Sequence, residues 1–190
     1  IADTRKVFER IRDDIKESFT KRKYMYVRNF GDGFGLSWQE AFQTRQKDEV
    51  QAYCQRNRIE YEWKSGDRLR TKQVRDVTAR HPKTGEWVWF NHLTFFHVST
   101  LDQSIRDSVM KEFAEEDLPN NTYYGDGQSI EPEVMEHLRE AYEKEKVRFD
   151  REEGDVLMLD NMLAAHGRES YAGERRVAVG MADIWSWDRV

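Results

Sequence analysis

The sequence has little of several features that define large classes of protein. It contains one cysteine, Cys54, so an internal disulfide is impossible and a reducing, cytoplasmic environment is favoured. No apolar run approaches the roughly 20 residues of a membrane span, and the run at 156–159 has the length of a strand. Acidic residues outnumber basic ones by 36 to 31, whereas a nucleic-acid-binding protein would show a basic stripe. We therefore expect neither a membrane nor a nucleic acid as a partner.

The 190 residues are enough for one domain with a hydrophobic core. No internal repeat, low-complexity tract or linker divides the chain, so residues 1–190 are predicted to belong to a single domain. The chain begins with Ile1, directly before a predicted helix. This start suggests that the sequence is the C-terminal major portion of a longer domain.

Hydrophobic periodicity predicts strands interrupted by helices. Helices are expected at 4–19, from Ser37 to 42, and at 47–56, 104–115 and 132–146. Strands are expected at 24–30, 59–63, 68–80, 86–98, 146–149, 155–159 and 175–182, with a turn at 82–85 and a loop at 118–128. This order favours a mostly β, antiparallel fold with helical insertions, either a jelly roll or a sandwich.

The chemically informative segment lies near the C-terminus. A predicted strand leads to Asp160 and Asn161, then to His166, and the last predicted strand opens on Arg175 and Arg176. Along that strand Arg176 shares a face with two very small residues, Ala178 and Gly180. An inward-facing arginine with space beside it suits a small carboxylate, which a guanidinium binds through two parallel hydrogen bonds.

These residues also have ordinary structural interpretations. From alternation alone, Arg176 is as well explained by an ion pair on an edge strand, and a lone histidine such as His166 more often makes structural hydrogen bonds. Asn91, in the aromatic strand, could offer its amide to a substrate or could satisfy backbone groups at a strand end. The residue pattern alone leaves these alternatives open.

Residues 154–182 resemble the C-terminal signature of the TauD/TfdA family of Fe(II)- and 2-oxoglutarate-dependent dioxygenases. They are most similar to its SyrP-like branch, which is often found in nonribosomal peptide biosynthesis. The resemblance extends to HPKTGEWVWFN at 81–91, TYYGDG at 122–127 and IADTR at 1–5, and so covers nearly the whole chain. It implies a double-stranded β-helix, or jelly roll, with the N-terminal part of the domain missing.

The resemblance also implies residue roles. His166 would be the distal histidine of the two-His-one-carboxylate iron site. One of the paired arginines would bind 2-oxoglutarate, and the alternation argument favours Arg176 over Arg175. Gly180 occupies the position at which taurine dioxygenases place a sulfonate-binding arginine, so a sulfonate is not expected. The implied reaction is hydroxylation of an amino acid, free or tethered to a peptidyl carrier protein, in antibiotic biosynthesis.

The sequence departs from the family in one respect. None of its five histidines is followed two residues later by Asp or Glu, so the family's His-x-Asp/Glu iron-binding motif is absent. We expect the other two iron ligands to lie upstream of Ile1. Two alternatives remain: a halogenase, if the upstream carboxylate is replaced, and a non-catalytic jelly-roll binding module.

Overall fold

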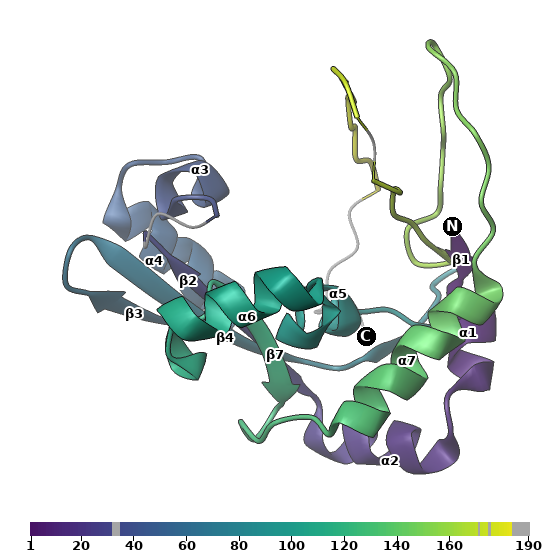
Figure 1. Ribbon diagram of the computed structural model, residues 1–190, viewed down its shortest axis with the longest axis horizontal. Coiled ribbons are helices and arrows are strands. Elements are labelled where there is room, and N and C mark those ends of the chain that lie inside the picture. The colour runs from purple at the N-terminus through teal and green to yellow at the C-terminus, as the bar shows by residue number, and fades with distance from the viewer. Residues whose placement is uncertain (32–34, 171, 175, 184–190) are drawn as a thin grey trace.

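The computed structural model describes residues 1–31, 35–170, 172–174 and 176–183. Their secondary structure alternates between helices and short strands (Figure 1). In chain order the elements are β1 (Ala2–Asp3), α1 (Thr4–Arg10), α2 (Asp13–Arg22), β2 (Tyr24–Phe30), α3 (Trp38–Phe42), α4 (Lys47–Arg56), β3 (Glu60–Lys64), β4 (Arg68–Arg75), β5 (Thr78–Arg80), β6 (Trp87–Trp89), α5 (Leu93–Phe96), η1 (Val98–Thr100), α6 (Gln103–Glu112), η2 (Glu115–Asp117), β7 (Asn120–Tyr124), α7 (Pro132–Glu145) and β8 (Ala164–Ala165).

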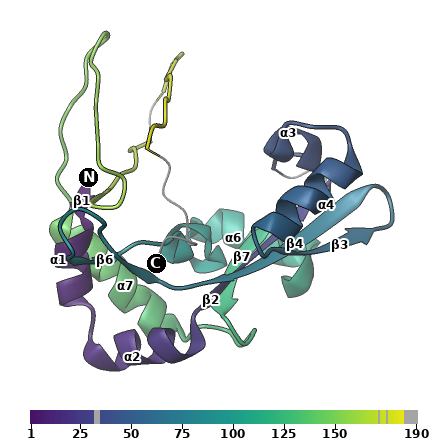
Figure 2. The same ribbon diagram turned by 180° about the vertical axis from the view of Figure 1, so that it is seen from behind.

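The largest sheet has four antiparallel strands in the order β3-β4-β2-β7. Strands β5 and β6 form a separate hairpin, and β1 pairs with β8 near the two ends of the described chain. Helices α3 and α4 lie at one end of the large sheet, and α1, α2 and α7 gather at the other (Figures 1 and 2). Within the described ranges the strands do not close into a barrel.

Two hydrophobic clusters correspond to these two ends. In the larger one, Phe19 of α2 packs against Trp89 at 5.9 Å and Tyr124 at 4.9 Å between ring centroids. In the smaller one, α4 contributes Cys54 against Phe30 of β2. Burial raises the pKa of the Cys54 thiol, which agrees with the inert cysteine that its sequence context indicates.

Several predicted elements are confirmed, and local chemistry explains them. Ser37 begins α3 with a capping box, because its hydroxyl accepts from the Glu40 amide while the Glu40 carboxylate accepts from the Ser37 amide. Pro132 stands in the first turn of α7, where a missing N–H leaves no bond unmade. The turn from α2 into β2 passes so close to Gly125 that a Cβ there would lie 2.2 Å from the Arg22 carbonyl oxygen.

Four predictions within the body of the fold are wrong. The single strand predicted for 68–80 is two strands, β4 and β5, which belong to different sheets. The helix predicted for 4–19 is two helices, because Ile11 is extended and its amide donates back to the Phe8 carbonyl. The long aromatic strand predicted for 86–98 ends at Trp89, since the side chain of Asn91 accepts from the Leu93 amide and begins α5. The loop predicted for 118–128 contains β7, whose backbone pairs with β2.

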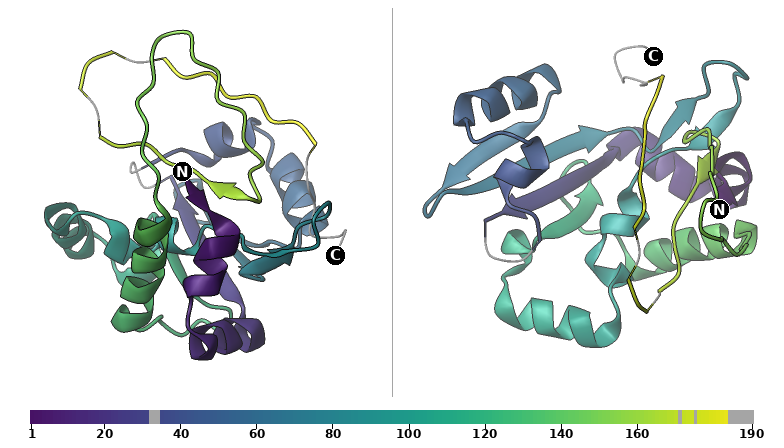
Figure 3. Two further views of the ribbon diagram at one scale, coloured as in Figure 1. Left: turned by 90° about the vertical axis from the view of Figure 1, so that its right-hand side faces the viewer. Right: turned by 90° about the horizontal axis from the view of Figure 1, so that it is seen from above.

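The predicted C-terminal strands are also not formed. Residues 148–159 extend away from the body as a long loop, and residues 176–183 run beside it without regular structure (Figure 3). Val156 is 93% exposed and Met158 is 92% exposed. A strand needs a partner for its backbone groups, and in the described part of the chain no strand pairs with either segment. The described fold is therefore mixed helix and sheet, and the mostly β prediction holds only for its central part.

None of the described helices has both the length and the apolar character that crossing a membrane requires.

Candidate functional site

The residues just before His166 form a tight turn centred on Asp160. The Asp160 carboxylate accepts from the Met162 amide at 3.0 Å. Its backbone carbonyl accepts from the Leu163 and Ala164 amides at 3.1 and 2.9 Å. The turn thus has its own hydrogen-bond framework, as expected of an Asp that bonds amides two residues ahead.

His81 holds this turn from the side of the β5–β6 hairpin. Its ring is 4% exposed, with Nε2 3.0 Å from Oδ2 of Asp160. Nδ1 accepts from the Thr84 amide at 3.1 Å, so in the neutral ring the proton lies on Nε2 and is donated to Asp160. Burial raises the pKa of Asp160, but hydrogen bonds from His81 and Met162 outweigh this and lower the pKa below its ordinary 3.8.

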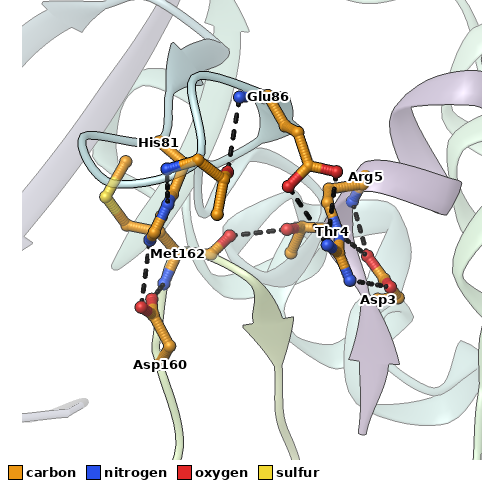
Figure 4. Close-up of polar contacts among 8 residues, drawn as sticks. Asp3, Thr4, Arg5, His81, Glu86, Asp160 and Met162 are labelled. Carbon is orange, nitrogen blue, oxygen red and sulfur yellow. Dashed lines mark hydrogen bonds and ion pairs between the residues drawn. The ribbon is translucent and has the colours of Figure 1, made fainter.

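Thr4, near the N-terminus, is hydrogen-bonded to the same turn (Figure 4). Its hydroxyl donates to the Met162 carbonyl at 2.5 Å, and its amide donates to the Leu163 carbonyl at 3.0 Å. Next to these bonds, Ala2 pairs with Ala165 across β1 and β8. The turn is therefore bonded to two segments that are far from it in sequence.

An ion-pair cluster joins β1 to the hairpin that carries His81. Arg5 binds Asp3 at 2.7 Å and Glu86 at 3.2 Å between nitrogen and oxygen (Figure 4). The hydrogen bond from Arg5 lowers the pKa of Asp3 despite partial burial. Because the Glu86 carbonyl also accepts a hydrogen bond from the His81 amide, the cluster and the His81 contact share one structural unit.

His166 directly follows β8 and is exposed. Its Nδ1 lies 3.5 Å from the Ala164 carbonyl oxygen, at the limit of a hydrogen bond. Burial lowers the pKa of His92, and the charge of His166 lowers this pKa further as a smaller effect. The sequence did not indicate this effect, because a single strand was predicted over residues 86–98, whereas His92 precedes α5.

The structure places the other predicted site residues as follows. Arg176 is exposed and makes no hydrogen bond or ion pair among the described residues, while Arg175 lies outside them. Both polar atoms of the Asn91 side chain engage backbone: Nδ2 donates to the Val77 carbonyl at 2.8 Å, and Oδ1 accepts from the Leu93 amide at 2.9 Å. Asn91 thus has an evident structural role, and a substrate contact there stays a prediction.

The described residues do not fit a complete iron centre. Across 1–31, 35–170, 172–174 and 176–183, no group of three or more His, Cys, Asp or Glu side chains is arranged to hold a metal ion. Among the described residues, no carboxylate forms a possible metal-binding group with His166. A two-His-one-carboxylate site therefore cannot be assembled from the described residues alone.

Comparisons with known proteins relate the chain to one family. Residues 1–182 match the family described as "Taurine catabolism dioxygenase TauD, TfdA family". The chain is 43% identical over 183 residues to the dapdiamide synthesis protein DdaC of Enterobacter agglomerans, covering 96% of this chain and 56% of DdaC. It is 22% identical over 185 residues to the clavaminate synthase-like protein At3g21360 of Arabidopsis thaliana, covering 92% of this chain and 53% of that protein.

The chain thus spans about half the length of the relatives it matches. The match nevertheless includes the His81 hairpin, the Asp160 turn and His166. The chain belongs to the TauD/TfdA family, whose members are Fe(II)- and 2-oxoglutarate-dependent dioxygenases.

Proposed function

We propose that the protein is an Fe(II)- and 2-oxoglutarate-dependent oxygenase that hydroxylates an amino acid, either free or tethered to a peptidyl carrier protein. The observation that carries this proposal is the family match over residues 1–182. The turn that begins at Asp160 also supports the proposal, because it is bonded to His81 and Thr4 and leads to His166. A metal ligand needs a backbone that is held rigidly in this way.

In this proposal the chain contributes part of the centre. His166 is one iron ligand, and Arg176, with Arg175 as the second choice, binds the far carboxylate of 2-oxoglutarate. Because the described residues offer no three-ligand group, the other iron ligands would come from residues outside the described ones. Asn91 remains a candidate for substrate contact only if its backbone bonds rearrange.

The substrate class follows from the relatives and from one sequence position. DdaC is named for dapdiamide synthesis, which supports a role in the biosynthesis of a specialised metabolite such as an antibiotic. Gly180 has no side chain with which to bind a sulfonate, so an amino acid is favoured over a taurine-like substrate. Free and carrier-tethered amino acids share the group that is hydroxylated, and both must be assayed.

The test is product analysis with the full chain under air, with Fe(II), 2-oxoglutarate and panels of free and carrier-bound amino acids. We expect a product heavier than its substrate by one oxygen atom, and loss of product and of bound iron in His166→Ala. His137→Ala is the matched control, because His137 lies on α7 and accepts only from the Arg12 amide. Halide incorporation would identify a halogenase, whereas no turnover and no retained iron would overturn the proposal.

A further inference from the structure

A groove lies between the large sheet and helices α3 and α4, apart from the elements that carry His166. It has a volume of about 510 Å³. Its floor is formed by β2 and β4, and its walls come from α3, α4 and the residues that join them. The lining includes Arg28, Phe30, Phe42, Tyr53, Thr71 and Gln73.

The charged group on the floor of the groove is Arg28. Its guanidinium lies 4.5 Å from the centroid of the Phe30 ring, so its plane is supported by an aromatic face. Its Nε is buried and has no hydrogen-bond partner. In the described part of the chain no carboxylate lies within ion-pairing distance of Arg28, although fourteen other Lys and Arg side chains there are paired with carboxylates.

Glu49 is the acidic side chain that lines the same groove. Its carboxylate accepts from the hydroxyl of Thr44 and is not paired with Arg28. Burying part of a guanidinium while one of its N–H groups has no acceptor costs free energy, unless an anion accepts that hydrogen bond. The unpaired Nε of Arg28 therefore indicates a negatively charged ligand.

The register of the sheet places polar groups beside this guanidinium. Arg28 is directly opposite Thr71, and Tyr26 is opposite Gln73, so all four side chains share one face of β2 and β4. Arg56, at the end of α4, adds a second positive charge to the lining. The floor thus offers a planar cation, a hydroxyl and an amide, which is the donor set that binds a carboxylate.

Part of the wall of the groove is aromatic. Phe42 and Tyr53 contact each other edge to face, with 5.5 Å between ring centroids, and Phe42 also lies 5.8 Å from Phe30. Aromatic walls over a polar floor are the usual composition of a small-molecule pocket. We propose that this groove binds a small organic acid, with its carboxylate on Arg28 and an apolar or aromatic body packed against Phe42 and Tyr53.

This binding site is separate from the proposed oxygenase centre, because neither His166 nor Arg176 belongs to its lining. Benzoate is a suitable probe, since it combines a carboxylate with an aromatic ring, and benzamide is the neutral control of the same shape. Calorimetric titration of the full chain should show benzoate binding and no benzamide binding. Inorganic phosphate tests whether the groove takes any anion, and binding as tight as that of benzoate would contradict an aromatic-acid site.

Variants of Arg28 distinguish a ligand-binding arginine from a structural one. Arg28→Met keeps the packing on Phe30 and should weaken benzoate binding by about tenfold to a hundredfold, the range for hydrogen bonds to a charged group. Arg28→Lys keeps the charge but not the two-pronged geometry and should give an intermediate loss. Arg12→Met is the matched control, because Arg12 is an exposed arginine paired with Asp14.

Thermal unfolding supplies a second readout. Benzoate should raise the melting temperature of the wild type and of Arg12→Met but not that of Arg28→Met. Without benzoate, Arg28→Met should melt at or above the wild-type temperature, because it removes an unpaired charge. A lower melting temperature in Arg28→Met, together with no benzoate effect on the wild type, would show that Arg28 is structural and would overturn the proposal.

Discussion

Nε2 of His81 lies 3.0 Å from Oδ2 of Asp160, which bonds the β5–β6 hairpin to the turn before His166. The two residues are 79 positions apart in sequence. The same turn is bonded to Thr4 from the other side. In the proposed oxygenase these contacts hold the backbone that positions His166 for a metal. The stability of the protein and its binding of iron can therefore be measured separately in variants of these contacts.

His81→Ala should destabilise the protein by about 2–4 kcal/mol, because it leaves the Thr84 amide unpaired and creates a cavity at a buried position. Urea unfolding measures this change as a lower midpoint at unchanged slope. His137→Ala, which alters a half-buried histidine on α7 that accepts one bond from the Arg12 amide, should cost no more than about 1 kcal/mol. Equal effects of the two substitutions would show that the His81 contact contributes nothing specific.

The stability supplied by Asp160 should depend on pH. Its pKa is lowered below 3.8 in the folded protein, so in acid the unfolded state binds more protons. This contribution is fully present above pH 3.8 and is lost as the pH falls through the folded-state pKa. The stability difference between wild type and Asp160→Asn should therefore shrink as urea unfolding is repeated at lower pH. A difference that stays constant across this range would contradict the assigned pKa direction.

Thr4→Val should destabilise the protein by about 1–3 kcal/mol, since an isosteric side chain leaves the buried Met162 carbonyl without its donor. Thr20→Val provides the control, because Thr20 makes a similar bond to the Lys16 carbonyl at an exposed position on α2. Hydrogen exchange should localise the effect: the amides of Met162, Leu163 and Ala164 should lose protection in Thr4→Val. Unchanged protection at these amides would show that the Thr4 hydrogen bond does not stabilise the turn.

Cys54 should react slowly with thiol reagents in the folded protein. It is fully buried on α4, and burial raises the pKa of its thiol, so little thiolate is available. Alkylation by iodoacetamide should accelerate to the rate of a free thiol in concentrated urea. Rapid alkylation of the native protein would show that α4 opens readily or does not pack as described.

Elements whose determinants are local were predicted well from sequence. The strand at 24–30 matches β2, and the helices at 47–56 and 132–146 match α4 and α7 to within a residue. The 82–85 turn correctly joined two strands, and Gly85 has the positive φ of 73° that such a turn favours. In these segments propensity, capping and turn chemistry all indicate the same structure.

Features that depend on distant contacts were not predicted. Aromatic alternation indicated a strand at 86–98, but the Asn91 side chain accepts from the Leu93 amide and a helix begins there. The bond between His81 and Asp160 leaves no local signal in one sequence, although both residues lie in segments that resemble the family. The C-terminal segments have the hydrophobic pattern of strands, and pattern alone does not supply a partner strand.

Succinate formation from 2-oxoglutarate by the full chain with Fe(II) and oxygen, compared across single variants, tests whether the protein is an oxygenase that uses His166. We expect wild type and His137→Ala to form succinate at similar rates, His166→Ala to form almost none, and Arg176→Gln to require much more 2-oxoglutarate. Succinate formation that is unchanged in His166→Ala, or absent from the wild type with every substrate tested, would overturn the oxygenase proposal.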